Sequence, residues 1–63
     1  MNQVQTDVEI ERRKLESARW AMLNDIACLR RDPSKYRAHI DVLRREVARI
    51  DRQLADLLQR AQL

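Results

Sequence analysis

Apolar side chains recur every three or four residues through the second half of the chain. From Tyr36 to Ala61 the steps between them alternate between four and three residues without interruption. This spacing is a heptad repeat, and it places the apolar positions on one narrow stripe of a helix with charged side chains elsewhere. We therefore predict a helix over about residues 35–61. Its stripe consists of Tyr36, Ile40, Leu43, Val47, Ile50, Leu54, Leu57 and Ala61.

The first half of the chain has a similar but less regular pattern, which predicts a helix over about residues 6–31. Thr6 and Glu9 match a capping box, in which Thr6 caps the first turn and Glu9 reaches back to the cap amide. Arg30 and Arg31 suit the other end, because cations stabilise the negative end of the helix dipole. The apolar stripe of this helix consists of Val4, Val8, Leu15, Ala18, Met22, Ile26 and Leu29.

Pro33 separates the two helices, because proline disfavours a helical conformation in the preceding residue and fits the first position of a new helix. Asp32 and Ser34 are both suitable N-caps for the second helix. A turn over about residues 32–34 makes the helices antiparallel neighbours. The predicted fold class is all-α, a single coiled-coil-like two-helix hairpin over residues 1–63. Its predicted core consists of Leu15, Met22, Ile26, Leu29, Ile40, Leu43, Val47, Ile50, Leu54 and Leu57.

A chain of 63 residues is too short to enclose an active-site cavity, and chains of this size usually need a disulfide, a metal or a partner. The single cysteine forms no internal disulfide, and no Cys/His cluster is present to hold zinc. Without glycine there is no phosphate-binding loop and no nucleophile elbow. We therefore expect no enzymatic activity, no cofactor and no metal. A partner chain or a second copy is expected to complete the hairpin.

The net charge of +3, with 37% charged residues, is mildly basic. Most of the basic residues are arginines, which is consistent with interface chemistry or with the codon bias of a GC-rich genome, and we favour codon bias. Arg45 and Arg52 each have an aspartate four residues away on the same face, Asp41 and Asp56, which favours a solvated surface of ion pairs. No aromatic residue interleaves with these arginines to stack on bases, so nucleic-acid binding is not expected.

No stretch of the sequence is apolar enough to span a membrane, and its first residues do not resemble a signal peptide. We therefore expect a soluble cytoplasmic protein with a reduced thiol at Cys28. Cys28 is interpreted as a small apolar filler. His39, the only histidine, has no nucleophile or carboxylate in the sequence that would make it catalytic, and it is interpreted as a surface residue.

The first helix has a wider apolar face than one antiparallel helix covers. Trp20, Leu23 and Ala27 lie roughly 80–140° around the helix from the stripe that should meet the second helix. They either fold over the edge of the hairpin or form a contact site for another chain, and we favour the contact site. Tyr36, at the turn end of the hairpin, either caps the open end of the core or contacts a bound protein. The candidate partner-binding residues are Trp20, Leu23, Ala27 and Tyr36.

From about Leu15 to Leu58, the chain resembles the small co-chaperones of type III secretion needle subunits. The resemblance lies in a charged amphipathic helix, the segment Asp32-Pro33-Ser34-Lys35-Tyr36 and a following heptad helix. It implies a helical hairpin that docks on a tetratricopeptide-like chaperone and helps keep a needle subunit or another export substrate monomeric in the bacterial cytosol.

The alternative is a homodimer in which two hairpins form a four-helix bundle that acts as a regulator or adaptor, conceivably on RNA. The two interpretations share the expectation of a protein partner with no small-molecule substrate and no insertion into a membrane. They differ in whether that partner is a second copy of the chain.

Overall fold

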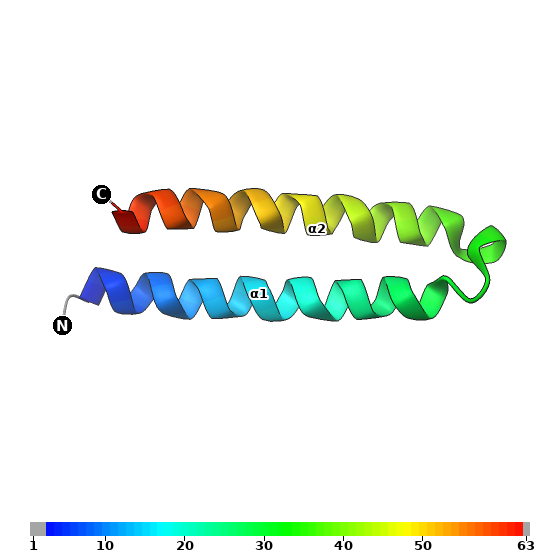
Figure 1. Ribbon diagram of the computed structural model, residues 1–63, viewed down its shortest axis with the longest axis horizontal. Coiled ribbons are helices and arrows are strands. Elements are labelled where there is room, and N and C mark those ends of the chain that lie inside the picture. Colours follow the sequence, from blue (N-terminus) through cyan, green and yellow to red (C-terminus); the bar gives the residue numbers. More distant parts are fainter. Residues whose placement is uncertain (1–2, 63) are drawn as a thin grey trace.

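The computed structural model describes the backbone of residues 3–62 and the side chains of residues 7–61. It contains two helices, α1 (Gln3–Leu29) and α2 (Pro33–Gln62), and no strand within the described residues. The helices run antiparallel and side by side, so that the Gln3 end of α1 and the Gln62 end of α2 lie at the same end of a rod 49 Å long (Figure 1). The predicted all-α helical hairpin is therefore confirmed.

The ends of α1 differ from the prediction. The helix begins at Gln3, so Thr6 lies within it rather than at the predicted capping position, and the side chain of Thr6 is outside the described residues. It ends at Leu29, so Arg30 and Arg31 belong to the turn. The turn therefore comes two residues earlier than predicted and covers residues 30–32.

Backbone hydrogen bonds between residues three apart end α1, where many helices end at a glycine in the left-handed conformation. Arg30 N–H still donates to the Ile26 carbonyl at 3.0 Å, and Asp32 N–H donates to the Leu29 carbonyl three residues back at 3.2 Å. Such i→i−3 bonds satisfy the last carbonyls without a left-handed residue. No described residue has a positive φ, as expected for a chain without glycine. Pro33 then prevents α1 from continuing.

Asp32, one of the two residues predicted as possible N-caps, is the N-cap of α2. Its carboxylate accepts a hydrogen bond from Lys35 N–H at 3.3 Å, and its carbonyl accepts one from Tyr36 N–H at 3.2 Å. At Tyr36 the backbone leaves helical geometry, with φ −107° and ψ 16°. The first turn of α2 is consequently set at an angle to the rest of the helix (Figure 1). The sequence pattern did not predict this kink.

The core is a single seam between the two helices. Ile26 of α1 and Ile40 and Val47 of α2 form a buried cluster, against which half-buried side chains pack. Ala61, the last position of the predicted stripe, is exposed and lies outside the core. All ten predicted core residues are buried or half-buried. The buried ones are Ile26, Ile40, Val47, Ile50 and Leu57, and the half-buried ones are Leu15, Met22, Leu29, Leu43 and Leu54.

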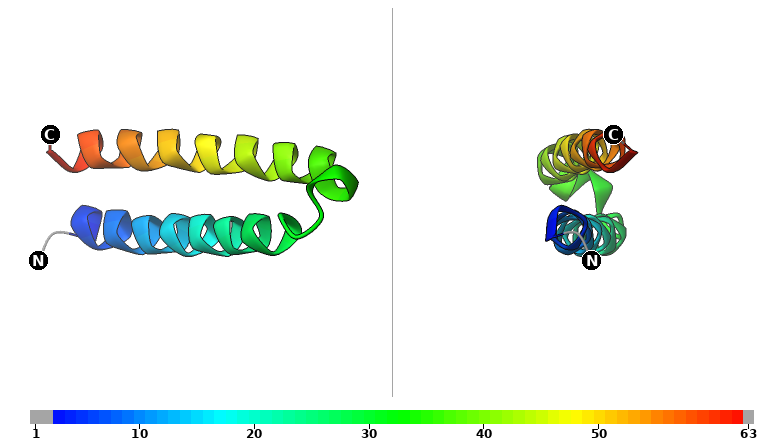
Figure 2. Two further views of the ribbon diagram at one scale, coloured as in Figure 1. Left: turned by 45° about the vertical axis from the view of Figure 1, so that its right-hand side comes forward. Right: turned by 90° about the vertical axis from the view of Figure 1, so that its left-hand side faces the viewer.

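The seam has only the depth of one layer of side chains. Ile50, the most buried of the residues whose side chains are described, still retains 4% exposure. The end-on view in Figure 2 shows why, since each helix has a single neighbour and its remaining circumference faces outward. The hairpin therefore depends on few apolar contacts, and each central one has a large share in its stability.

Replacing Ile50 by aspartate tests this dependence. A buried carboxylate without a partner should cost about 3–5 kcal/mol and unfold both helices together. Circular dichroism during thermal unfolding measures the effect. Gln53→Asp, an equal change in charge at an exposed position of the same helix, should leave the melting temperature nearly unchanged. Equal helicity and stability in the two variants would contradict the position of the seam.

Candidate partner-binding surface

Trp20 projects from the outer side of α1, away from the seam. Its exposed fraction is 69%, the largest among the exposed large apolar residues described. It therefore does not fold over the edge of the hairpin. Leu23, three residues later, is 39% exposed, and Ala27, one further turn along, is also exposed. We refer to Trp20, Leu23 and Ala27 as the Trp20 face.

The helical register explains why these residues share one side. At 100° per residue, Trp20 lies about 160° around α1 from Met22 and about 120° from Ile26, the residues that meet α2. Leu23 and Ala27 lie between Trp20 and one edge of the seam. The Trp20 face is thus continuous on α1, and the second helix of the same hairpin is too far around to cover it.

Tyr36 does not join the Trp20 face. It is half-buried and packs against the cluster of Ile26, Ile40 and Val47, at the kink of α2. The ammonium group of Lys35 lies 5.3 Å from the centre of its ring, close enough for a cation–π contact. The structure thus places Tyr36 as a cover on the turn end of the core. Of the four candidate partner-binding residues, only Trp20, Leu23 and Ala27 lie together.

Three further large apolar side chains are exposed that the sequence pattern did not single out as a surface. They are Ile10 (48%), Val42 (54%) and Leu58 (55%). Val42 and Leu58 are sixteen residues apart on α2, which corresponds to about 24 Å along the helix. Isolated apolar side chains on a surface are common and need no partner. The Trp20 face is different because its members are neighbours.

Cys28 and His39 are both exposed. The interpretation of Cys28 as an apolar filler is therefore wrong, since its position on α1 turns the thiol away from the seam. Within the described part of the chain, no three His, Cys, Asp or Glu side chains gather as metal ligands would. Neither described helix has a segment with the length and apolarity that crossing a bilayer requires.

The surface charges pair differently from the prediction. Among the described residues, neither Asp41 with Arg45 nor Arg52 with Asp56 comes within ion-pair distance. The pairs that form within α2 and between the helices are Arg49 with Glu46 at 3.5 Å and Arg19 with Asp51 at 2.7 Å. Because Arg19 and Asp51 come from different helices, this ion pair joins α1 to α2 at an exposed position.

The first half of α1 carries the most connected group of charges. Arg12 hydrogen-bonds to Glu9 and also pairs with Glu16 at 3.0 Å, while Arg13 lies 3.4 Å from Glu9. The hydrogen bond from Arg12 lowers the pKa of Glu9, and the positive charges of Arg12 and Arg13 add to this effect. The bond to Glu9 in turn raises the pKa of Arg12.

No protein-family model matches the chain, and neither a curated protein nor a solved structure gives a match.

The lowered pKa of Glu9 predicts a small dependence of stability on pH. Because the folded state holds the carboxylate ionised, its contribution is complete above the usual glutamate pKa of about 4.3 and is lost as the pH falls through the lower folded value. The group is exposed, so we expect a modest effect that salt weakens. In urea unfolding followed between about pH 5 and pH 3, Glu9→Gln should flatten the decline relative to the original protein. Identical declines would contradict the ion-pair assignment.

Proposed function

We propose that this protein is a binding module for another protein, and that the Trp20 face is its contact surface. The observation that carries the proposal is the 69% exposure of Trp20 beside Leu23 and Ala27. Tryptophan is enriched among the residues that dominate the energies of protein–protein interfaces. A contiguous apolar face on an otherwise charged helix is the surface that a partner helix would cover. We propose no catalytic step and no cofactor.

The small core also supports this proposal, because it leaves the hairpin with little stability of its own. The hairpin has one layer of apolar contacts, and a partner that binds only the folded chain stabilises it by mass action. Packing a further helix on the Trp20 face would place α1 between two apolar neighbours. Binding and folding are then coupled.

The specific form suggested by the resemblance over residues 15–58 is a type III secretion co-chaperone in the bacterial cytoplasm. Its partner would be a tetratricopeptide-like chaperone, together with a needle subunit or another export substrate. A hairpin with one exposed apolar face suits such a role, because helical-repeat proteins present extended concave surfaces that accept a helix. The assignment rests on the resemblance of the turn and of the two helices.

A homodimeric four-helix bundle is the second candidate, and the charges beside the Trp20 face favour it. Glu16, which also pairs with Arg12, lies one turn before Trp20, and Arg31 follows Ala27 by four residues, in the turn after α1; both are exposed. A two-fold axis through the face would place Glu16 of one copy near Arg31 of the other. Such a dimer would act as an adaptor or regulator.

Truncation of Trp20 tests the contact surface. Because its side chain is exposed in the hairpin, Trp20→Ala should leave the helicity nearly unchanged. It should weaken association by about 2 kcal/mol, or about 30-fold, as expected for a central tryptophan. Circular dichroism measures the first effect, and titration with the co-purified partner, or dilution of the dimer, measures the second. Val42→Ala on α2 is the matched control, and a similar loss in both variants would contradict the proposal.

The concentration dependence of thermal unfolding separates the two candidates. A homodimer should have a melting temperature that rises with protein concentration, and a dimer mass at micromolar concentration. A co-chaperone should be a marginally stable monomer whose melting temperature rises only when its partner is added. Analytical ultracentrifugation and calorimetry over a 100-fold range of concentration, roughly, provide both measurements. A stable dimer would exclude the co-chaperone form while leaving the Trp20 face as the interface.

A further inference from the structure

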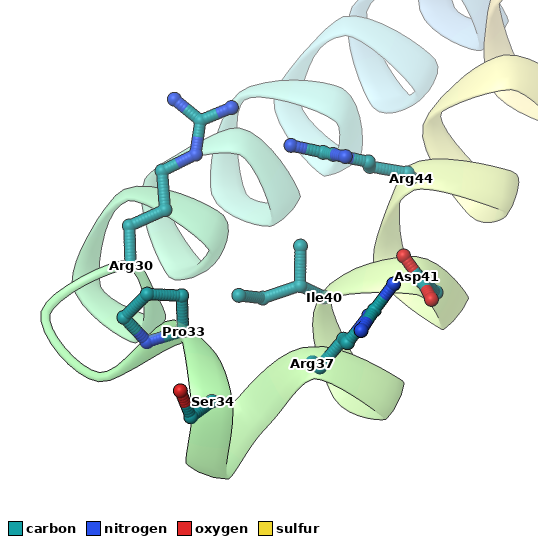
Figure 3. A pocket seen from close by; sticks show the side chains of 7 residues that line it. All are labelled: Arg30, Pro33, Ser34, Arg37, Ile40, Asp41 and Arg44. Atoms are coloured by element: carbon teal, nitrogen blue, oxygen red, sulfur yellow. The ribbon is translucent and has the colours of Figure 1, made fainter.

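A groove of about 640 Å³ lies at the turn end of the hairpin, on the side where α1 and α2 meet. Three arginines line it, and the buried side chain of Ile40 forms its floor together with Pro33 (Figure 3). We refer to this feature as the arginine groove, which is defined by Arg30, Pro33, Arg37, Ile40, Asp41 and Arg44.

The fold brings these arginines together from two elements. Arg37 and Arg44 are seven residues apart, so they lie on the same side of α2 about 10 Å apart along its axis. Arg30 stands at the opposite side of the groove, because α1 ends before it. Figure 3 shows Arg30 on one side of Ile40 and Arg44 on the other, whereas Arg37 points toward Asp41.

The positive charges of this groove lack acidic partners. Arg12, Arg13, Arg19 and Arg49 all form ion pairs elsewhere on the hairpin. Arg30, Arg37 and Arg44 form none with any carboxylate of the described residues. Asp41 is the one acidic side chain on the lining, so three positive charges face one negative charge. An anionic ligand would relieve the repulsion between the arginines.

We propose that the arginine groove binds an acidic peptide segment of a partner protein. Guanidinium groups bind carboxylates through two parallel hydrogen bonds, so two acidic residues of the peptide would pair with Arg30 and Arg44. An apolar side chain between them would cover Ile40. Arg30 and Arg44 lie on opposite sides of Ile40, so one acidic residue should stand on each side of the apolar one.

The composition of the groove favours a peptide over a nucleic acid. Its floor is apolar, which suits an apolar side chain of a peptide better than a polyphosphate backbone. Single-stranded nucleic acids also need aromatic side chains for base stacking, whereas the nearby Tyr36 packs into the core. The arginine groove and the Trp20 face share no residue, so this inference does not depend on the proposed function.

The test is binding of a fluorescein-labelled peptide with two glutamates three positions apart and a leucine between them, followed by fluorescence anisotropy at low salt. Replacing both Arg30 and Arg44 by glutamine should weaken binding at least about tenfold, because two charge-assisted contacts are lost. Replacing Arg45 and Arg52 by glutamine makes the same change in net charge at exposed positions outside the groove. This control should change the affinity by less than about twofold.

Three additional arms complete the test. A peptide with serine in place of leucine should bind more weakly. The Trp20→Ala variant should bind the original peptide with the same affinity as the original protein. A labelled single-stranded RNA of equal charge should bind less tightly than the peptide. Circular dichroism confirms that the arginine variants remain folded.

Several results would overturn the proposal. Absence of peptide binding would do so directly. Equal weakening in the Arg30/Arg44 and Arg45/Arg52 double variants would show that the peptide responds only to the net charge of the protein. Tighter binding of the RNA, with the same loss in the Arg30 and Arg44 variant, would reassign the groove to nucleic acid. Loss of peptide binding in Trp20→Ala would place the peptide on the Trp20 face instead.

Discussion

The packing of one apolar stripe against another is the interaction on which the whole molecule depends. Ile26, Ile40 and Val47 form its centre, and Ile50 and Leu57 continue the buried side of α2 toward the chain ends. No second layer covers this seam. The isolated helices would not be stable in water, since neither could bury its apolar side. Every surface of the protein is therefore positioned by the contact of α1 with α2.

The turn is built under the constraint that the chain has no glycine. A left-handed residue is the usual way to end a helix, and here the ending relies on i→i−3 hydrogen bonds and on Pro33. The chain re-enters a helix through the Asp32 cap and leaves helical geometry once more at Tyr36. This compact route places Arg30 opposite Arg37 and Arg44. The arginine groove is thus a consequence of how the turn closes.

The heptad stripe was predictable because helix period and apolar spacing agree over seven turns of one element. The ends of α1 were not predictable in the same way. Thr6 and Arg31 are residues typical of helix ends, but neighbouring residues can also form the hydrogen bonds that begin or end a helix. Surface ion pairs were also mispredicted, because exposed side chains have several conformations of similar energy. The sequence does not indicate the groove, because Arg30 and Arg44 are distant in sequence and the pattern predicts Arg30 in a helix rather than in the turn.

The two proposed surfaces differ in their physical chemistry. Trp20 and Arg30 are ten residues apart, or about 15 Å along the direction of α1. Burial of Trp20 is governed by the hydrophobic effect and changes little with ionic strength, whereas pairing at Arg30 and Arg44 weakens as salt screens the charges. A partner held at both places gains affinity from the linkage of the two contacts. If one partner occupied both surfaces as proposed, added salt would release its acidic segment first and leave it attached through the Trp20 face.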